Sequence, residues 1–269
     1  MRVDLASSKG KPGWDNEDFV AAVPTAVVLL DGAGISGIEA ICRHGVAWYT
    51  HRLGGALIER LSRDDGRDVK DILAEAIDEV TDDHRDTCDV TDPSSPSATV
   101  ALLRVAAENA DYLVLSDSFL VLEQADGSTR VITDGREVDI RHRYAAPMLA
   151  AVRGTPEYER ARAAAITGFR ASRNQPGGFW VAKNDPLAAQ EAVVGSVPTA
   201  DLVSATLMSN GASRIVDRFG LADWPGVVRI LSDEGPAGVL TRVREAEASG
   251  ARTGAARSTT TPRSPTAPR

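Results

Sequence analysis

The chain is poor in cysteine, in aromatic residues and in long apolar runs. Only two of its 269 residues are cysteines, Cys42 and Cys88, and aromatic residues make up 5%. Neither cysteine has C-x-x-C or zinc-finger spacing, and Cys42, on an apolar helical face, is expected to be a buried core thiol. No apolar run approaches 18 residues, and no signal-peptide core follows the first residues. We therefore expect a cytoplasmic protein that does not enter a membrane.

Basic residues are outnumbered, and the formal net charge is −8. Residues 249–269 contain four arginines and no acid and so carry a charge of +4, which leaves −12 on residues 1–248. Such an acidic body argues against binding to a nucleic-acid backbone and suits a protein that holds divalent cations. The apolar fraction of 43% is ordinary for a globular protein and is enough for one large domain with a core.

Hydrophobic periodicity divides the chain into strands and helices. Apolar residues at spacings of three or four predict a long helix over 42–61, and a second helix is expected from Asp68. Later helices are expected over 143–172, with a break near Gly154-Thr155-Pro156, from Asp185, and at 212–219, 224–233 and 235–247. Short β-branched runs predict strands at 18–23, 26–31, 99–105, 112–115, 119–122, 129–132 and 202–208. The alternating segment RVDLAS predicts a further strand near the N-terminus, and the loop at 174–182 is expected to enter another strand. Because the strands come in hairpin-like pairs, the order favours an α+β sandwich.

Three acidic corners share one arrangement, a carboxylate beside the start or end of an apolar strand. Glu17 and Asp18 precede one strand, Asp31 and Gly32 end the next, and Asp117 lies between two later strands. Glycine after Asp31 lets a backbone carbonyl approach an ion, and converging carboxylates require a cation to neutralise them. Taken singly, each acid is better explained as a turn former.

The order of the motifs carries more information than any one of them. The segments NEDF, VVLLDGAG, SPSATV, LVLSDSFLVL and LMSNGAS follow one another over residues 2 to about 220. This ordered set resembles the type 2C, metal-dependent (PPM-type) protein serine/threonine phosphatases, in a divergent bacterial branch. That family has a Glu-Asp pair, a strand ending in Asp-Gly, a Ser-Gly-Thr-Thr-like segment, a Gly-Asp-Ser hairpin and a Ser-Asp-Gly corner.

The resemblance implies a four-layer α-β-β-α fold, an antiparallel β-sandwich flanked by helices, with two Mn²⁺ or Mg²⁺ ions at one end. By position, Asp31 would bridge the ions, the Gly32 carbonyl would complete one of them, and Glu17 and Asp18 would hold metal-bound waters. Asp117 matches an acid that contacts a third ion in bacterial members. The implied reaction is attack of a metal-activated water on phosphoserine or phosphothreonine of a protein, with Asp31 and Asp18 as catalytic residues.

The chain departs from the family pattern at two metal-binding positions. The last acidic corner reads Ser209-Asn210-Gly211, so Asn210 would offer a metal one neutral oxygen in place of a carboxylate, and affinity should fall. A closing strand with a final Asp is not found, so the last strand of the fold is expected to be missing. His44 and His51, seven residues apart on one expected helix face, are interpreted as surface or packing residues. A proton-donating role for His44 is the weaker alternative.

Residues 249–269, SGARTGAARSTTTPRSPTAPR, contain no apolar side chain larger than alanine apart from proline. This composition is typical of a disordered basic tail, so residues 1–248 are taken as the phosphatase-like domain. A sharper hypothesis is a frameshift near residue 249, because Arg, Ala, Thr and Pro dominate when a GC-rich gene is read in the wrong frame. Another frame of the coding DNA should then encode an Asp-Asp-x-Thr-like strand.

Three functions remain open from the sequence. The first is a metal-dependent protein phosphatase whose activity is impaired by Asn210 and by the absent C-terminal Asp. The second is a catalytically inactive relative, a pseudophosphatase that binds a phosphoprotein or another partner as a regulatory domain. The third is a structural α+β domain whose acids only form turns. The substrate protein, the substrate-binding residues and the oligomeric state are not indicated.

Overall fold

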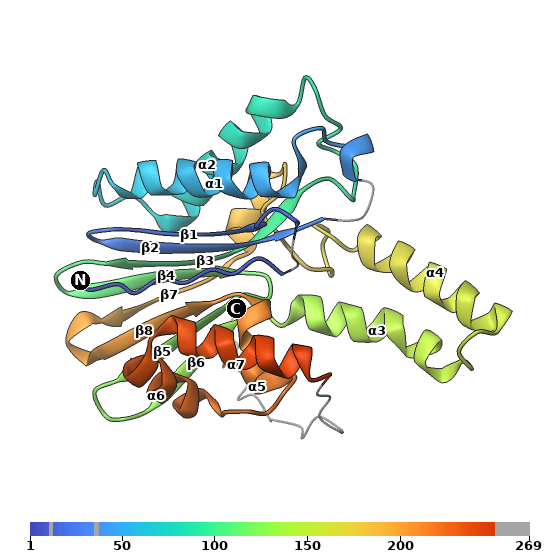
Figure 1. The fold of residues 1–269 in the computed structure, drawn as a ribbon. Helices are drawn as coiled ribbons and strands as arrows, with labels where there is room; N and C mark the ends of the chain where they lie inside the picture. The colour runs from blue at the N-terminus through green and yellow to red at the C-terminus, as the bar shows by residue number, and fades with distance from the viewer. Residues whose placement is uncertain (11–12, 35–37, 251–269) are drawn as a thin grey trace, which may run out of the picture.

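Two antiparallel β-sheets lie face to face at the centre of the molecule (Figure 1). The structure, a computed structural model, describes residues 1–10, 13–34 and 38–250. The larger sheet has the order β1-β2-β3-β4-β7, formed by β1 (Asp18–Val23), β2 (Ala26–Ala33), β3 (Ser97–Val105), β4 (Asn109–Leu115) and β7 (Val193–Pro198). The smaller sheet has the order β6-β5-β8, formed by β5 (Phe119–Gln124), β6 (Thr129–Thr133) and β8 (Leu202–Met208).

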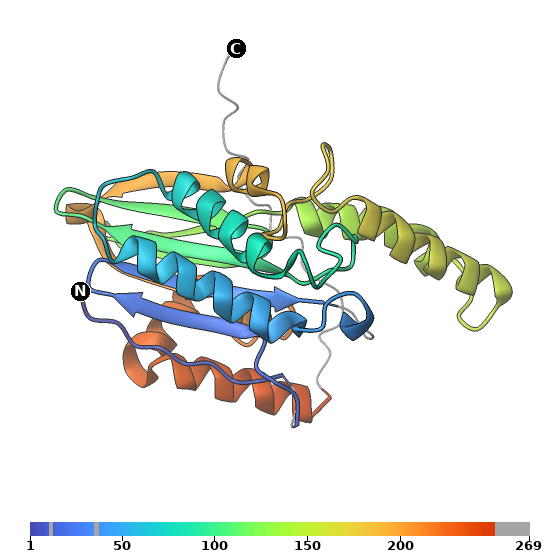
Figure 2. The same ribbon diagram turned by 90° about the horizontal axis from the view of Figure 1, so that it is seen from above.

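Helices cover both outer faces of the two sheets. The larger sheet is covered by α1 (Gly45–Leu61) and α2 (Val69–His84), which lie over it in Figure 2. The smaller sheet is covered by α5 (Asn210–Asp217), α6 (Trp224–Glu234) and α7 (Pro236–Ala248). A hairpin of α3 (Arg136–Ala150) and α4 (Pro156–Ala171) extends away from one end of the sandwich (Figure 1). Short 3-10 turns lie at Ile38–Ala40, Pro186–Glu191 and Thr199–Asp201.

Strand β4 shows how the sequence pattern builds the layers. Successive side chains of a strand point to opposite faces of a sheet. Leu113 and Leu115 accordingly join the core under α1 and α2, while Tyr112 and Val114 join the core between the two sheets. All four side chains are buried, because this strand has apolar layers on both faces. A third core, with Ile215 at its centre, lies under α5, α6 and α7.

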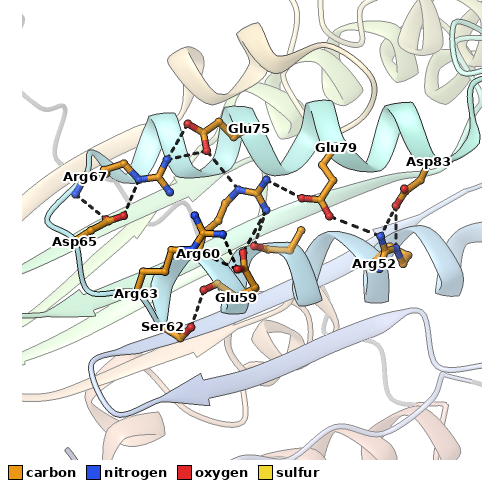
Figure 3. A network of polar contacts seen from close by, with 11 residues as sticks. Arg52, Glu59, Arg60, Ser62, Arg63, Asp65, Arg67, Glu75, Glu79 and Asp83 are labelled. Carbon is orange, nitrogen blue, oxygen red and sulfur yellow. Dashed lines mark hydrogen bonds and ion pairs between the residues drawn. The ribbon is translucent and has the colours of Figure 1, made fainter.

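Helices α1 and α2 are also joined by ion pairs along their outer side (Figure 3). Arg52 donates a hydrogen bond of 3.0 Å to Asp83, and Arg60 lies 2.7 Å from Glu79. Such pairs at a surface contribute little individually, so the apolar layer beneath them holds the helices to the sheet.

The expected four-layer α-β-β-α sandwich is confirmed, while three local expectations are wrong. RVDLAS forms no strand, and residues 179–182 contribute only a bridge between Ala98 and Ala182. The segment from Asp185 forms a 3-10 turn and is followed by β7, which the sequence did not predict. Hydrogen bonding to the edge of β4 makes VVGSVP a strand, although its own composition, with Gly195 in the middle, is weak for a strand.

The smaller sheet ends at β8, which has one strand neighbour, β5. Beside β8 lies a hollow of about 750 Å³ between the sheets, lined by residues of β1, β2, β8, α6 and α7 and by residues 1–8. No strand follows β8 in the part of the chain that the structure describes. The frameshift hypothesis and most of the expected tail concern residues 251–269, which lie outside the described residues. Within the described ranges, no helix is long and apolar enough to cross a membrane.

Candidate metal centre

The hairpin of β1 and β2 places two acids directly opposite each other. Asp18 pairs with Asp31 in the antiparallel register, and their carboxyl groups are within hydrogen-bonding distance. Burial, and then the charges of Asp18 and Asp117, raise the pKa of Asp31 well above its usual value. Burial also raises the pKa of Asp18, although a hydrogen bond with Asp31 and the charge of Arg244 oppose this shift. The pair therefore resists carrying two negative charges without a cation.

Gly32 is needed where β2 leaves the site, because nothing larger fits there. Its N–H donates a hydrogen bond of 3.1 Å to the Glu17 carbonyl. A Cβ on Gly32 would lie 2.6 Å from Thr50 Oγ1, 2.7 Å from Val46 Cγ1 and closer still to the Glu17 carbonyl oxygen. The Thr50 hydroxyl is buried without a hydrogen-bond partner. A polar atom left unpaired in this way is unusual in a protein core.

Asp117 reaches the same place from the turn between β4 and β5. It follows Ser116, whose φ of 65° lies in the left-handed region that glycine adopts most easily. The Asp117 side chain is buried, and its carboxylate accepts a hydrogen bond of 3.0 Å from the side-chain amide of Asn210. The backbone N–H of Asn210 donates to the Asp31 carboxyl group. Asn210, the first residue of α5, thus contacts both acids.

One further acid, Glu137, completes the cluster and was not predicted from the sequence. It lies in the first turn of α3, is buried, and accepts a hydrogen bond of 3.0 Å from Ser116 Oγ. Burial and then the charge of Asp117 raise the pKa of Glu137. Arg141, one helical turn later, pairs with Glu137 and lies 3.9 Å from Asp117. No local motif signals Glu137, because an acid in a first helical turn is common for reasons of the helix dipole alone.

The third segment of the ordered motif set also lies beside the acids. Thr99 of β3 pairs with Asp31 in the register, and its hydroxyl lies 2.6 Å from Ser118 Oγ next to Asp117. Ser97 at the start of β3 donates to the Ala33 carbonyl at 3.3 Å. Five sequence segments spread over about two hundred residues therefore converge at one end of the sandwich.

The two histidines that were considered with the acids have other neighbours. His51, in α1, lies with Nε2 3.2 Å from the Asp18 carbonyl oxygen, at the edge of the site. His44 precedes α1, and its Nδ1 lies near the sulfur atoms of Cys42 and Cys88. His44 packs against Trp48, as the interpretation as a packing residue expected, but it precedes α1 and so does not share a helix face with His51.

The donor set of this corner fits a hard divalent cation. Carboxylates of Asp31, Asp18 and Asp117 and the backbone carbonyl oxygens beside Gly32 are oxygen donors of the kind that Mg²⁺ and Mn²⁺ prefer. The raised pKa values of Asp18 and Asp31 show that the group is unfavourable as a set of free anions. Asn210 contributes an uncharged amide to this corner, where its side chain donates to Asp117.

Comparison with known proteins identifies the family of this chain. A family model described as protein phosphatase 2C matches residues 8–168, more than half of the chain. The chain belongs to the protein phosphatase 2C family. This is a family of serine/threonine protein phosphatases, as the ordered motifs implied. None of the curated protein sequences matches the chain.

Solved structures share the fold at low sequence identity. The serine/threonine phosphatase PstP/Ppp of Mycobacterium tuberculosis aligns with a TM-score of 0.56 and 17% identity, covering 89% of this chain and 88% of that one. The serine/threonine phosphatase of S. agalactiae aligns with a TM-score of 0.55 and 14% identity, over 90% and 92%. Stp1 from Staphylococcus aureus aligns with a TM-score of 0.54 and 12% identity, over 93% and 92%. A structure of the PstP catalytic domain, with a TM-score of 0.52 and 18% identity over 89% and 88%, is a complex with two manganese ions.

Proposed function

We propose that this member of the protein phosphatase 2C family hydrolyses phosphoserine and phosphothreonine in proteins with Mn²⁺ or Mg²⁺ bound at the Asp18–Asp31–Asp117 corner. The observation that carries the proposal is the convergence of these three acids, from three strand ends, at a site where burial and mutual repulsion raise the pKa of Asp31. The bound ions would supply an activated water and neutralise the charge of the phosphate ester.

Each residue of the corner has a distinct part in this proposal. Asp31, whose carboxyl group is affected by the charges of both Asp18 and Asp117, is proposed to bridge two ions. The Gly32 carbonyl is proposed to complete one ion, since Gly32 lets the backbone approach closely. Glu17 and Asp18, at the start of β1, are proposed to hold metal-bound waters. Asp117 is proposed to contact a further ion, in place of the hydrogen bond that it now accepts from Asn210.

The proposed phosphatase domain spans residues 1–248, since α7, which ends at Ala248, completes the helical layer over the smaller sheet. We infer a cytoplasmic location, supported by two cysteines that are both free thiols, as is usual in a reducing compartment. The activity is proposed to be weaker than that of a site with acids at every metal position, because Asn210 is neutral and β8 is an edge strand.

The experiment is hydrolysis of p-nitrophenyl phosphate and of a phosphothreonine peptide by the purified chain, with Mn²⁺, with Mg²⁺ and with chelator. We expect metal-dependent turnover that Asp31→Asn abolishes. Asp4→Asn, which changes an exposed aspartate paired with Arg2, is the matched control and should retain the rate. Turnover that persists in chelator or in Asp31→Asn would contradict the proposed site.

The second candidate function is binding of a phosphoprotein without hydrolysis. The Asn210–Asp117 hydrogen bond favours it, because the amide satisfies an acid that would otherwise need a cation. Absence of turnover together with binding of the phosphothreonine peptide, and not of its unphosphorylated form, would support this function over the first.

A further inference from the structure

A second cluster of ligand-type side chains lies away from the carboxylates, at the start of α1. Cys42, His44 and Cys88 bring two sulfur atoms and one imidazole nitrogen within 4.8 Å of one another. His44 Nδ1 lies 3.4 Å from Cys88 Sγ and 3.9 Å from Cys42 Sγ. Both cysteines are free thiols, Cys42 fully buried and Cys88 half-buried.

These distances match those between ligands of one tetrahedral zinc ion. Zinc lies about 2.3 Å from a thiolate sulfur and about 2.0 Å from an imidazole nitrogen, so the sulfur and nitrogen of a tetrahedral site are roughly 3.5 Å apart. The observed separations of 3.4 and 3.9 Å fall on both sides of that value. Two thiolates and an imidazole are a soft donor set, which selects Zn²⁺ over the Mn²⁺ or Mg²⁺ that the carboxylate corner prefers.

The backbone holds the three ligands together although 44 residues separate His44 from Cys88. The Asp89 N–H donates a hydrogen bond of 3.0 Å to the Ile41 carbonyl, which joins the two loops beside the sulfur atoms. Backbone N–H groups of Arg43 and His44 donate to the Cys88 sulfur. Donors of this kind at the start of a helix favour the thiolate form that a metal requires.

The surroundings of His44 fix its ring in place. It stacks on Trp48, with ring centroids 4.3 Å apart and planes 24° apart. Arg43 Nε now donates to His44 Nε2 at 3.4 Å, and Arg43 is exposed. When Nδ1 binds a metal, the ring proton resides on Nε2, so the Arg43 side chain has to turn toward solvent, which its exposure permits.

We propose that Cys42, His44 and Cys88 form a zinc-binding site that joins the loop before α1 to the loop between α2 and β3. His44 and Cys88 are half-buried, which leaves a fourth position of the tetrahedron for water. The ion would tie residues 42–44, just before α1, to the loop after α2. The proposal does not depend on the phosphatase activity, because its ligands are separate from the carboxylates.

The test uses the full chain, reduced, freed of metal by chelator and kept without oxygen, titrated with Zn²⁺ and in parallel with Co²⁺ as a spectroscopic substitute. We expect one tightly bound ion with a thiolate-to-cobalt charge-transfer absorption, and a rise in melting temperature on adding one equivalent of Zn²⁺. Cys88→Ser and His44→Asn are expected to weaken zinc binding on the order of tenfold or more. Even substitutions of residues that only hydrogen-bond to metal ligands typically lower metal affinity by about 10–100-fold.

Asp31→Asn separates this site from the carboxylate corner, where Co²⁺ or Zn²⁺ could also bind. The charge-transfer absorption should persist in Asp31→Asn and vanish in Cys88→Ser. The absorption is also measured on the unchanged chain, so the proposal remains testable even if Cys88→Ser does not fold. The proposal is overturned if the unchanged chain shows no thiolate absorption, or if Cys88→Ser and His44→Asn bind zinc as tightly as the unchanged chain.

Discussion

The side-chain amide of Asn210 donates a 3.0 Å hydrogen bond to the carboxylate of Asp117. Several carboxylates lie close together at this site. The amide N–H group places a partial positive charge beside them and so partly offsets their mutual repulsion, as a bound cation would. It also keeps the two corners, β4–β5 and β8–α5, together without metal.

Asn210→Asp is expected to convert this hydrogen bond into a repulsion that a divalent cation relieves. Mn²⁺ affinity should rise about tenfold, which corresponds to roughly 1.4 kcal/mol, and metal-dependent hydrolysis should rise with it. Calorimetric titration with Mn²⁺ and p-nitrophenyl phosphate hydrolysis measure both effects. Asn210→Ala, which removes the amide without adding charge, is the control and should gain no affinity. Equal affinity in the two variants would show that residue 210 does not contact the ion.

Asp31→Asn is expected to raise the stability of the metal-free protein while it abolishes metal binding. The substitution removes a buried charge next to Asp18 and Asp117. A gain of about 1 kcal/mol would raise the melting temperature by about 2–4 °C in a domain of this size. Melting curves in chelator measure the gain, with Asp4→Asn as the neutral control. A lower melting temperature in chelator would mean that Asp31 stabilises the fold through its hydrogen bonds.

The metal-free protein should be more stable in mild acid than at neutral pH. Burial raises the pKa of Asp31, Asp18 and Glu137 in the folded state, and the unfolded chain has ordinary values. The folded state therefore binds protons more tightly, so this stabilisation is fully present below the unfolded pKa and is lost as pH rises through the folded pKa. Urea unfolding in chelator, from about pH 5 to about pH 8, should show a falling free energy of unfolding.

Saturating Mn²⁺ should flatten or reverse that slope, because the ion binds the deprotonated acids. The slope in chelator should also be smaller in Asp31→Asn. A slope that is unchanged by this substitution would assign the pH dependence to other groups.

Gly32→Ala is expected to destabilise the protein by about 1–3 kcal/mol, as other overpacked sites do. The added Cβ would meet Thr50 Oγ1 at 2.6 Å and Val46 Cγ1 at 2.7 Å. Gly55→Ala is the matched control, since a Cβ at that position of α1 meets nothing within 4 Å and alanine favours a helix. Urea unfolding of the two variants should therefore give shifts of opposite sign, and similar shifts would contradict the close packing at Gly32.

The sequence predicted the parts of the molecule in which local pattern and final environment agree. The apolar stripe of α1 and the strand that ends at Asp31 are buried as expected, because their periodicity reflects one dominant neighbouring layer. Asp18, Asp31, Asp117 and Asn210 could be placed together only through the resemblance, since no local rule joins residues so far apart. The structure shows these residues in contact, while their proposed metal-binding roles await the experiments above.

What the sequence missed depends on tertiary contacts. Strand β7 is formed by pairing with β4, and Glu137 becomes a site acid only because α3 begins beside Asp117. Cys42 was correctly expected to be buried, but its partner Cys88 lies in another loop, and their spacing fits no known motif. The number of residues between two such cysteines does not predict whether they are in contact. Their contact depends on how the two loops pack in the folded state.

The register of Asp18 against Asp31 also bears on how the chain reaches its fold. A hairpin joined by a short turn closes early, because its contacts are local. Like charges directly opposite each other in an antiparallel pair oppose that closure. The two residues proposed to hold a cation are thus expected to slow the pairing of the strands that carry them. If the proposed site binds a divalent ion, that ion is expected to favour formation of the β1–β2 hairpin during refolding as well as to act in the folded protein.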